Sequence, residues 1–335
     1  MLTTLTAPAF AGTWYIEEGD ITITAGESGN DVTQKGETTY GDKDTVITNH
    51  DKDKASSNTV TIEAENKDDK VEVTLKDVNI DTSSRSEAAV SVTGEGNTNI
   101  ELDGDNALKS DIYSSGISSS GSLTISGGEN DSLTAQGGSG ADGIYSSGSL
   151  TISGGTVTAN GGSSGGGDGG DGIWSSGGVT ISGGSTVTAN GGNGGNVSGA
   201  GIISDGGVTI SGGTVNAAGG DSKDGYGGDG IRSGGVVTIS GNTVNAAGGN
   251  GGKVGGDGIY SNDIDLSGSL ELTAKAGSPN GKALSQNGKE LNLDTIKDKL
   301  GPGAKVTATD ADGKVIDQVS TPRPVEPEES SSSSD

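Results

Sequence analysis

The sequence predicts an all-β fold, a parallel β-helix solenoid whose rungs contain about 27 to 29 residues. Three observations lead to this prediction: a regular internal repeat, short runs in which apolar and small polar residues alternate, and a composition with 65 glycines among 335 residues. A period between about 20 and 50 residues is typical of stacked repeat architectures. We expect a right-handed coil, closed by an N-terminal β cap and by a short C-terminal cap with a hairpin.

The repeat is clearest in a series of isoleucines that each follow a glycine. Successive members lie 27, 29, 29, 29 and 28 residues apart, at these positions: Ile117, Ile144, Ile173, Ile202, Ile231 and Ile259. One unit contains three short alternating pieces with these apolar members: Ile144; Leu150 and Ile152; Val157 and Ala159. Alternation with period two is a strand signal. Three strands and three turns therefore make one coil of the β-helix.

Glycine-rich spacers of variable length, such as residues 163–171 (SSGGGDGGD), separate the third strand from the next unit. We expect each spacer to form a loop at one corner of its rung, with its glycines supplying turns of positive φ. A single rung cannot fold alone. Burying five side chains contributes about 10 kcal/mol, whereas ordering each residue costs roughly 1 to 2 kcal/mol. Stacked rungs share their apolar columns and ladder hydrogen bonds, so the unit of folding is the stack.

The chain divides into five segments. We expect a signal-peptide remnant (1–11), irregular N-terminal rungs and a cap (12–106), regular glycine-rich repeats (107–278), a C-terminal cap and hairpin (279–319), and a disordered Pro/Glu/Ser linker (320–335). The triplet from Ala9 to Ala11 matches an A-x-A cleavage site, which indicates export to the medium or to a bacterial cell surface. The Asp312-Gly313 pair predicts the turn of the hairpin.

Charge and composition exclude several classes of partner. The formal net charge is −26 and the pI is about 4.1, so the phosphates of a nucleic acid would be repelled. Cysteine is absent, which excludes disulfides and thiolate metal sites. No stretch approaches the ~18 to 20 apolar residues of a membrane span, so we expect no membrane insertion.

An aspartate recurs immediately before the glycine that precedes the repeated isoleucine. Its members are Asp142, Asp171, Asp229 and Asp257, with Ala200 interrupting the series. Stacked rungs would place these carboxylates ~4.8 Å apart, where they repel each other. The column, together with Asp168, is a candidate Ca²⁺ site, because Ca²⁺ prefers several oxygen ligands. The alternative is that aspartate simply suits a glycine-rich turn.

A second column follows the repeated isoleucine and should point outward, since the isoleucine points inward. It contains Tyr145, Trp174, Ile203, Arg232 and Tyr260. Exposed aromatic rings on an acidic, hydroxyl-rich face can stack on sugar rings, which makes Tyr145, Trp174, Arg232 and Tyr260 candidate ligand-binding residues. The alternative is that these side chains only shield the glycine turns.

Catalysis is not expected, although parallel β-helices often carry polysaccharide lyase or glycosidase sites. A lyase needs a basic group beside acidic residues that hold Ca²⁺, and an inverting glycosidase needs carboxylates about 6.5 to 9.5 Å apart. The only histidine, His50, lies outside the regular repeats, and Arg232 stands alone in its rung. The sequence therefore predicts a non-enzymatic protein.

The motif LTISGGTVTANGG, followed by GDGI before the next strand, resembles a known family. It is similar to secreted bacterial parallel β-helix repeat proteins that contain a carbohydrate-binding domain, over roughly residues 71–276. The resemblance implies a pectate-lyase-like fold without the catalytic base, and an association with acidic, pectin-like polymers and calcium. Two functional classes remain: a module that binds polysaccharide or a host or cell-surface glycan, and a non-catalytic adhesin or structural stalk of the bacterial surface.

Overall fold

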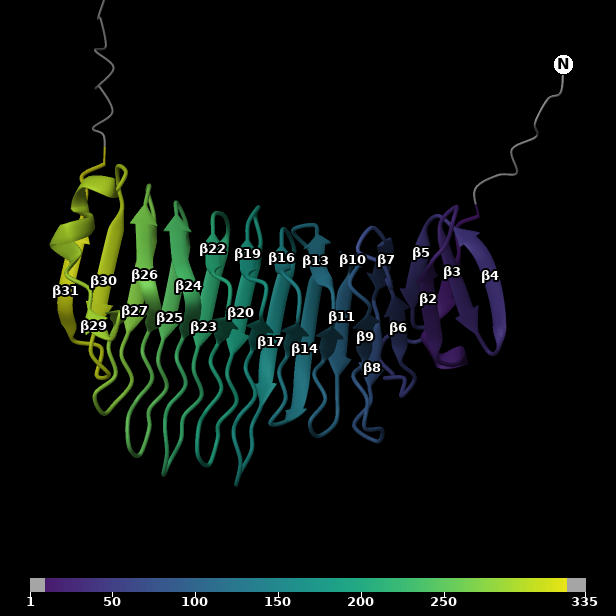
Figure 1. Cartoon of the computed structure of the whole chain (residues 1–335), viewed down its shortest axis with the longest axis horizontal. Coiled ribbons are helices and arrows are strands. Elements are labelled where there is room, and N and C mark those ends of the chain that lie inside the picture. Colours follow the sequence, from purple (N-terminus) through teal and green to yellow (C-terminus); the bar gives the residue numbers. More distant parts are fainter. Residues whose placement is uncertain (1–9, 324–335) are drawn as a thin grey trace, which may run out of the picture.

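The computed structural model describes residues 10–323 and shows a parallel β-solenoid of about nine turns, with its axis along the length of the molecule (Figure 1). The rungs contain about 28 residues and only 3% of the chain is helical, which confirms the predicted fold class. Residues 1–9 and 324–335 lie outside the described part, so most of the expected signal-peptide remnant and linker cannot be compared with the structure.

The three strands expected in each unit are present. In the unit that begins at Ile144 they are β15 (Ile144–Ser146), β16 (Leu150–Ile152) and β17 (Thr156–Gly162). The parallel register preserves the repeat, because Ile144 pairs with Ile117 on one side and with Ile173 on the other. Equivalent residues therefore form columns along the axis, which we name the first, second and third strand columns.

The first and second columns belong to one 21-stranded sheet. The first column contains β9 (Val90–Thr93), β12 (Ile117–Ser119), β15, β18 (Ile173–Ser175), β21 (Ile202–Ser204) and β28 (Leu284–Gln286). The second contains β10 (Asn97–Asp103), β13 (Ser122–Gly127), β16, β19 (Val179–Ile181) and β22 (Val208–Ile210). The long strands β24 (Ile231–Ser240) and β26 (Ile259–Ser267) continue both columns.

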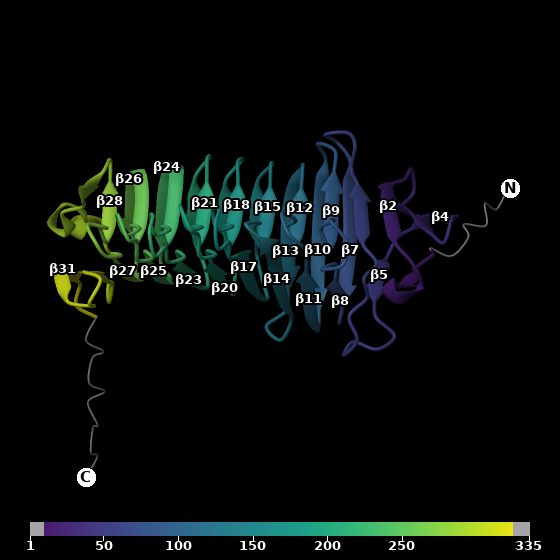
Figure 2. The ribbon, with the colours of Figure 1, turned by 90° about the horizontal axis from the view of Figure 1, so that it is seen from below.

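The third column is a separate ten-stranded sheet. It contains β8 (Asn79–Asp81), β11 (Asp105–Lys109), β14 (Ser132–Ser139), β17, β20 (Thr186–Asn190), β23 (Thr214–Ala218), β25 (Thr243–Ala247), β27 (Glu271–Lys275), β30 (Lys305–Thr309) and β31 (Val315–Ser320). Figure 2 shows the first and third columns as two rows of strands along the axis.

The two ends differ from the regular rungs. The N-terminal segment contains β1 (Thr13–Tyr15), η1 (Ile16–Glu18), β2 (Ile21–Ala25), β3 (Asn30–Gln34), β4 (Glu37–Asp42), β5 (Thr45–Thr48), β6 (Val60–Glu63) and β7 (Lys70–Lys76). Strands β2, β3 and β4 form an antiparallel meander. At the other end, β29 (Lys289–Glu290), the 3-10 helix η2 (Leu293–Lys299) and the antiparallel β30–β31 hairpin follow the last rungs.

One hydrophobic core runs through the solenoid from Ile16 to Val319. Its members are mostly Ile, Val, Leu and Ala from the inward positions of all three columns, and Ile144, Ile152 and Val157 are fully buried. Since small aliphatic residues fill the narrow interior, the low aromatic content of the chain is sufficient for this fold. The irregular N-terminal rungs and the regular repeats share the same core.

The spacers leave one corner of each rung, as expected, and Figure 1 shows them as parallel tubes below β17 to β27. The expected reason for their glycines holds at Gly140, in the spacer before Ile144, where φ is +73°. It is wrong for the spacers 161–172, 191–201, 219–230 and 248–258, in which no glycine has a positive φ. At most of these glycines, Gly165 and Gly166 excepted, neighbouring backbones approach so closely that a side chain cannot fit. A Cβ atom on Gly228 would lie 1.8 Å from the carbonyl oxygen of Gly199.

Buried glycines connect the spacers through backbone hydrogen bonds. Each spacer has an outgoing arm, which leaves the third strand column, and a return arm, which leads back to the next repeated isoleucine. Within one spacer the return arm bonds to the outgoing arm, with Gly199 N–H donating to the Gly192 carbonyl at 2.9 Å. The next outgoing arm then bonds to this return arm, with Gly220 N–H donating to Gly199 at 2.9 Å. We name this alternating series the glycine ladder: Gly162, Gly170, Gly192, Gly199, Gly220, Gly228, Gly249, Gly256 and Gly277. The ladder fixes the spacers as an ordered layer beside the sheets.

Candidate ligand-binding groove

The aspartates before the repeated isoleucines form a column at the base of the spacers. Each carboxylate Oδ1 accepts the backbone N–H of the equivalent residue one rung further on. The donor and acceptor lie 2.6 to 2.7 Å apart in these pairs: Asp171 to Asp142, Ala200 to Asp171, Asp257 to Asp229, and Lys282 to Asp257. Aspartate at this position therefore links adjacent rungs, a structural use that is more specific than a general preference for turns.

Burial changes the protonation of this column. Burial raises the pKa of Asp142 to about 6. Burial, and then the neighbouring charge of Asp142, raise the pKa of Asp171 to about 7. Burial also raises the pKa of Asp229, while the Arg232 guanidinium acts in the opposite direction. Burial therefore favours the protonated form of these carboxyls to a higher pH than in free aspartate, and a protonated member reduces the repulsion within the column.

The outward column stacks on itself along the axis. The rings of Tyr145 and Trp174 lie parallel, with centroids 4.7 Å apart and planes inclined by 5°. The Arg232 guanidinium lies 4.6 Å from the centroid of the Tyr260 ring. Neighbours in the column therefore cover one face of the Tyr145 ring and one face of the Tyr260 ring, while Trp174 has a neighbour on either side, Tyr145 and Ile203.

Another column of side chains lies on the return arms of the spacers, and we name it the return-arm column. It was not identified from the sequence. Val197 pairs with Tyr226, and Tyr226 pairs with Val254, through isolated parallel bridges. These side chains are 45%, 47% and 36% exposed, which is unusual in a glycine-rich layer. The signal was present in the sequence, because each lies three residues before Ala200, Asp229 or Asp257. A side chain that keeps a constant distance in sequence from the acidic column, although the spacers vary in length, indicates a structural column.

These three columns surround a hollow of about 680 Å³, which we name the main groove. Its lining includes the acidic column from Asp171 to Asp257, the outward column with Ile203, Arg232 and Tyr260, and the return-arm column with Val197, Tyr226 and Val254. Lys282 also lines it, one rung beyond Asp257. The structure thus brings together five of the candidates from the sequence: Asp171, Asp229, Asp257, Arg232 and Tyr260.

The remaining candidates lie elsewhere on the same side. Asp142 and Tyr145 line a second hollow of about 430 Å³, together with Tyr113. Trp174 and Asp168 line neither of these two hollows. Asp168 Oδ1 accepts the Val197 N–H at 3.3 Å, so it belongs to the return-arm column and is separate from the acidic column.

The described residues 10–323 contain no group of three or more His, Asp or Glu side chains placed to hold a metal ion. A calcium ion at this site would therefore take most of its oxygen ligands from backbone carbonyls, water or a bound ligand. In Asp171 and in Asp257, Oδ1 accepts a hydrogen bond whereas Oδ2 accepts none from the described residues. These two Oδ2 atoms can therefore serve as calcium ligands.

His50 lies in the N-terminal segment between β5 and β6. Its ring stacks on Tyr15 with centroids 3.6 Å apart, and its Nε2 lies 3.1 Å from Glu18 Oε1. His50 lines neither the main groove nor the second hollow. Absence of catalysis stays a prediction.

Comparison with protein-family models, with curated proteins and with solved structures gave no match. Among the residues that the structure describes, no helix has the length and apolar character needed to cross a membrane.

Proposed function

We propose that the chain is a non-catalytic carbohydrate-binding module that acts outside the cell, at a bacterial surface or in the medium. The observation that supports this most is the main groove, a concave hollow of about 680 Å³ whose lining combines apolar and aromatic side chains with charged and polar groups. Ligand sites in proteins are typically concave and mostly apolar, with a few polar groups that fix orientation.

The chemistry of the groove suits a sugar. Tyr226 and Tyr260 offer aromatic surface with a polar tip, which packs on the apolar C–H faces of sugar rings. Carboxylate oxygens accept hydrogen bonds and Arg232 donates them, and sugar hydroxyls can do both. The lining spans the rungs from Asp171 to Lys282, so the groove suits a polysaccharide or an extended surface glycan.

Calcium is part of this proposal for acidic polysaccharides. A chain with a net charge of −26 repels a polyanion unless a cation bridges them. The free Oδ2 atoms of Asp171 and Asp257 could provide part of such a bridge, with the polymer supplying further oxygens. A neutral glycan would need no ion.

Affinity electrophoresis tests the proposal. We expect wild-type protein to be retarded by polygalacturonate or by a neutral plant or mucin-type polymer. The Tyr226→Ala variant should lose about tenfold in affinity, because one aromatic contact is removed. Tyr40→Ala is the matched control, since Tyr40 is 74% exposed and lies on β4 in the N-terminal segment.

Each lane is run with Ca²⁺ and with chelator. Retardation by polygalacturonate that disappears with chelator supports the calcium bridge, whereas retardation by a neutral polymer in both conditions supports direct stacking. If no polymer retards the protein in either condition, the carbohydrate-binding proposal is wrong.

A structural stalk or adhesin is the second candidate. The observation that favours it is the continuous core from Ile16 to Val319, flanked by spacers that the glycine ladder holds in place. Such a rod can project another domain from a surface without binding a glycan. It would be the better account of a protein that no polymer retards.

A further inference from the structure

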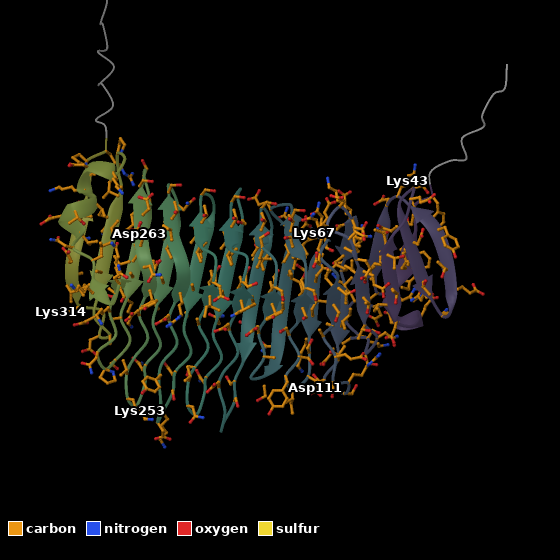
Figure 3. The ribbon with its side chains drawn as sticks, viewed as in Figure 1. Lys43, Lys67, Asp111, Lys253, Asp263 and Lys314 are labelled. Atoms are coloured by element: carbon orange, nitrogen blue, oxygen red, sulfur yellow. The ribbon has the colours of Figure 1, made fainter. Side chains whose placement is uncertain are left out.

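A strained aromatic residue lies near the amino-terminal end of the spacer layer. Tyr113, between β11 and β12, is 85% exposed and has a φ of +64°. Residues with a Cβ atom rarely adopt this left-handed conformation, and such strain is concentrated at binding and catalytic sites. The turn is fixed by the Ser114 N–H, which donates to the Asp111 carbonyl at 2.9 Å. Figure 3 shows Asp111 at the lower edge of the solenoid, where the loops end.

Tyr113 and Tyr145 both line the second hollow of about 430 Å³. The rest of the lining is rich in hydroxyl and carboxylate groups, from these side chains: Ser86, Ser91, Ser114, Ser115, Ser118, Glu87 and Asp142. Hydroxyl groups donate and accept hydrogen bonds, as sugar hydroxyls do. The second hollow therefore repeats the combination found in the main groove, an exposed tyrosine above polar groups.

The two hollows are successive stretches of one track. On one wall, Tyr145 pairs in register with Trp174, and Trp174 with Ile203 of the main groove. On the base, Asp142 accepts the N–H of Asp171.

The opposite wall also continues from one hollow to the other. The Tyr113 ring lies 3.9 Å from the position of a Cβ on Gly140, and the Asp168 carbonyl oxygen lies 3.1 Å from the same position. Asp168 Oδ1 accepts the Val197 N–H, and Val197 pairs with Tyr226. Tyr113 is therefore four rungs from Tyr226, which at ~4.8 Å per rung is about 19 Å along the axis.

We infer that the ligand is a linear polysaccharide segment lying along the solenoid axis, and that Tyr113 with the second hollow forms a sugar-binding subsite separate from the main groove. This inference rests on the proposed function. A monosaccharide or a chain end would fill one hollow only, whereas a linear chain longer than about 19 Å contacts both tyrosines. Binding at two linked subsites raises the affinity for long chains above that for short ones.

A glycan array tests the inference, with oligosaccharides of defined length printed from plant, microbial and mucin-type polymers. The variants are Tyr113→Asn, which removes the ring but tolerates positive φ, and Tyr113→Phe, which keeps the ring. Tyr226→Ala reports on the main groove, and Tyr40→Ala is the exposed control on β4.

We expect Tyr113→Asn to lower affinity about tenfold for chains longer than about 19 Å and to leave the shortest bound oligomers unaffected. Tyr113→Phe should retain affinity for all lengths, and Tyr226→Ala should weaken both classes. If short and long oligomers bind equally and Tyr113→Asn has no effect, the second subsite is refuted while the main groove stands. If no oligomer binds in any condition, the proposed function fails as well.

Discussion

The apolar columns and the glycine ladder run along the same rungs, but they depend on opposite properties of the side chain. In the core, Ile181 and its equivalents stabilise the stack because their methyl groups fill the interior. In the ladder, Gly228 and its equivalents stabilise it because they have no side chain, so that backbone carbonyls and N–H groups can meet. The comparison teaches that a glycine-rich spacer can be as constrained as a core strand.

Replacement of Ile181 by Asp should produce the largest effect on the core side of the comparison. Ile181 is fully buried, so the variant places an unpaired carboxylate in the interior. We expect a loss of at least about 4 kcal/mol in the free energy of unfolding, measured by urea denaturation. Ile181→Val is the control and should cost only about 0.5 to 1.5 kcal/mol. Equal effects of the two variants would show that Ile181 does not face the core.

The glycine ladder should respond to a single added methyl group. In Gly228→Ala the new Cβ overlaps the Gly199 carbonyl, and the rungs must separate to accept it. We expect a loss of about 1 to 3 kcal/mol in the free energy of unfolding. Gly166→Ala is the matched control, because nothing lies within 4 Å of its Cβ position and it should change stability by less than about 0.5 kcal/mol. If both alanine variants are equally stable, the spacers are loose loops.

The acidic column should give an effect that depends on pH. The pKa of Asp171 is raised from 3.8 to about 7, so the folded state binds more protons than the unfolded state in this interval. Its contribution to stability is therefore complete below pH 3.8 and is lost as the pH rises through about 7.

We expect Asp171→Asn to be more stable than wild type by about 1 to 3 kcal/mol above the pKa of Asp171. The amide oxygen can still accept the Ala200 N–H, but the side chain cannot ionise. Melting temperatures across the pH range, in chelator, measure the difference, and Asp205→Asn at an exposed position is the control. A variant that melts below wild type at alkaline pH would mean that the charged form of Asp171 stabilises the fold.

The strands, the outward column and the acidic column could be predicted from the sequence because they depend on period and alternation alone. The period places Tyr145 beside Trp174 and Asp142 beside Asp171, and the structure agrees. The role of the glycines could not be predicted in this way, because it depends on the distance between backbones of different spacers. The same limit applies to Tyr226, whose place in the main groove requires the return arm to lie against the sheet.

Hydrogen exchange in the presence of each polymer tests the central claim most directly, because it locates the bound ligand on the chain. The account predicts protection of the return arms at Val197, Tyr226 and Val254 by a polymer that retards the protein, with no change across the ten-stranded sheet. Protection of the ten-stranded sheet alone, or unchanged exchange with every polymer, would contradict the assignment of the main groove as a glycan site.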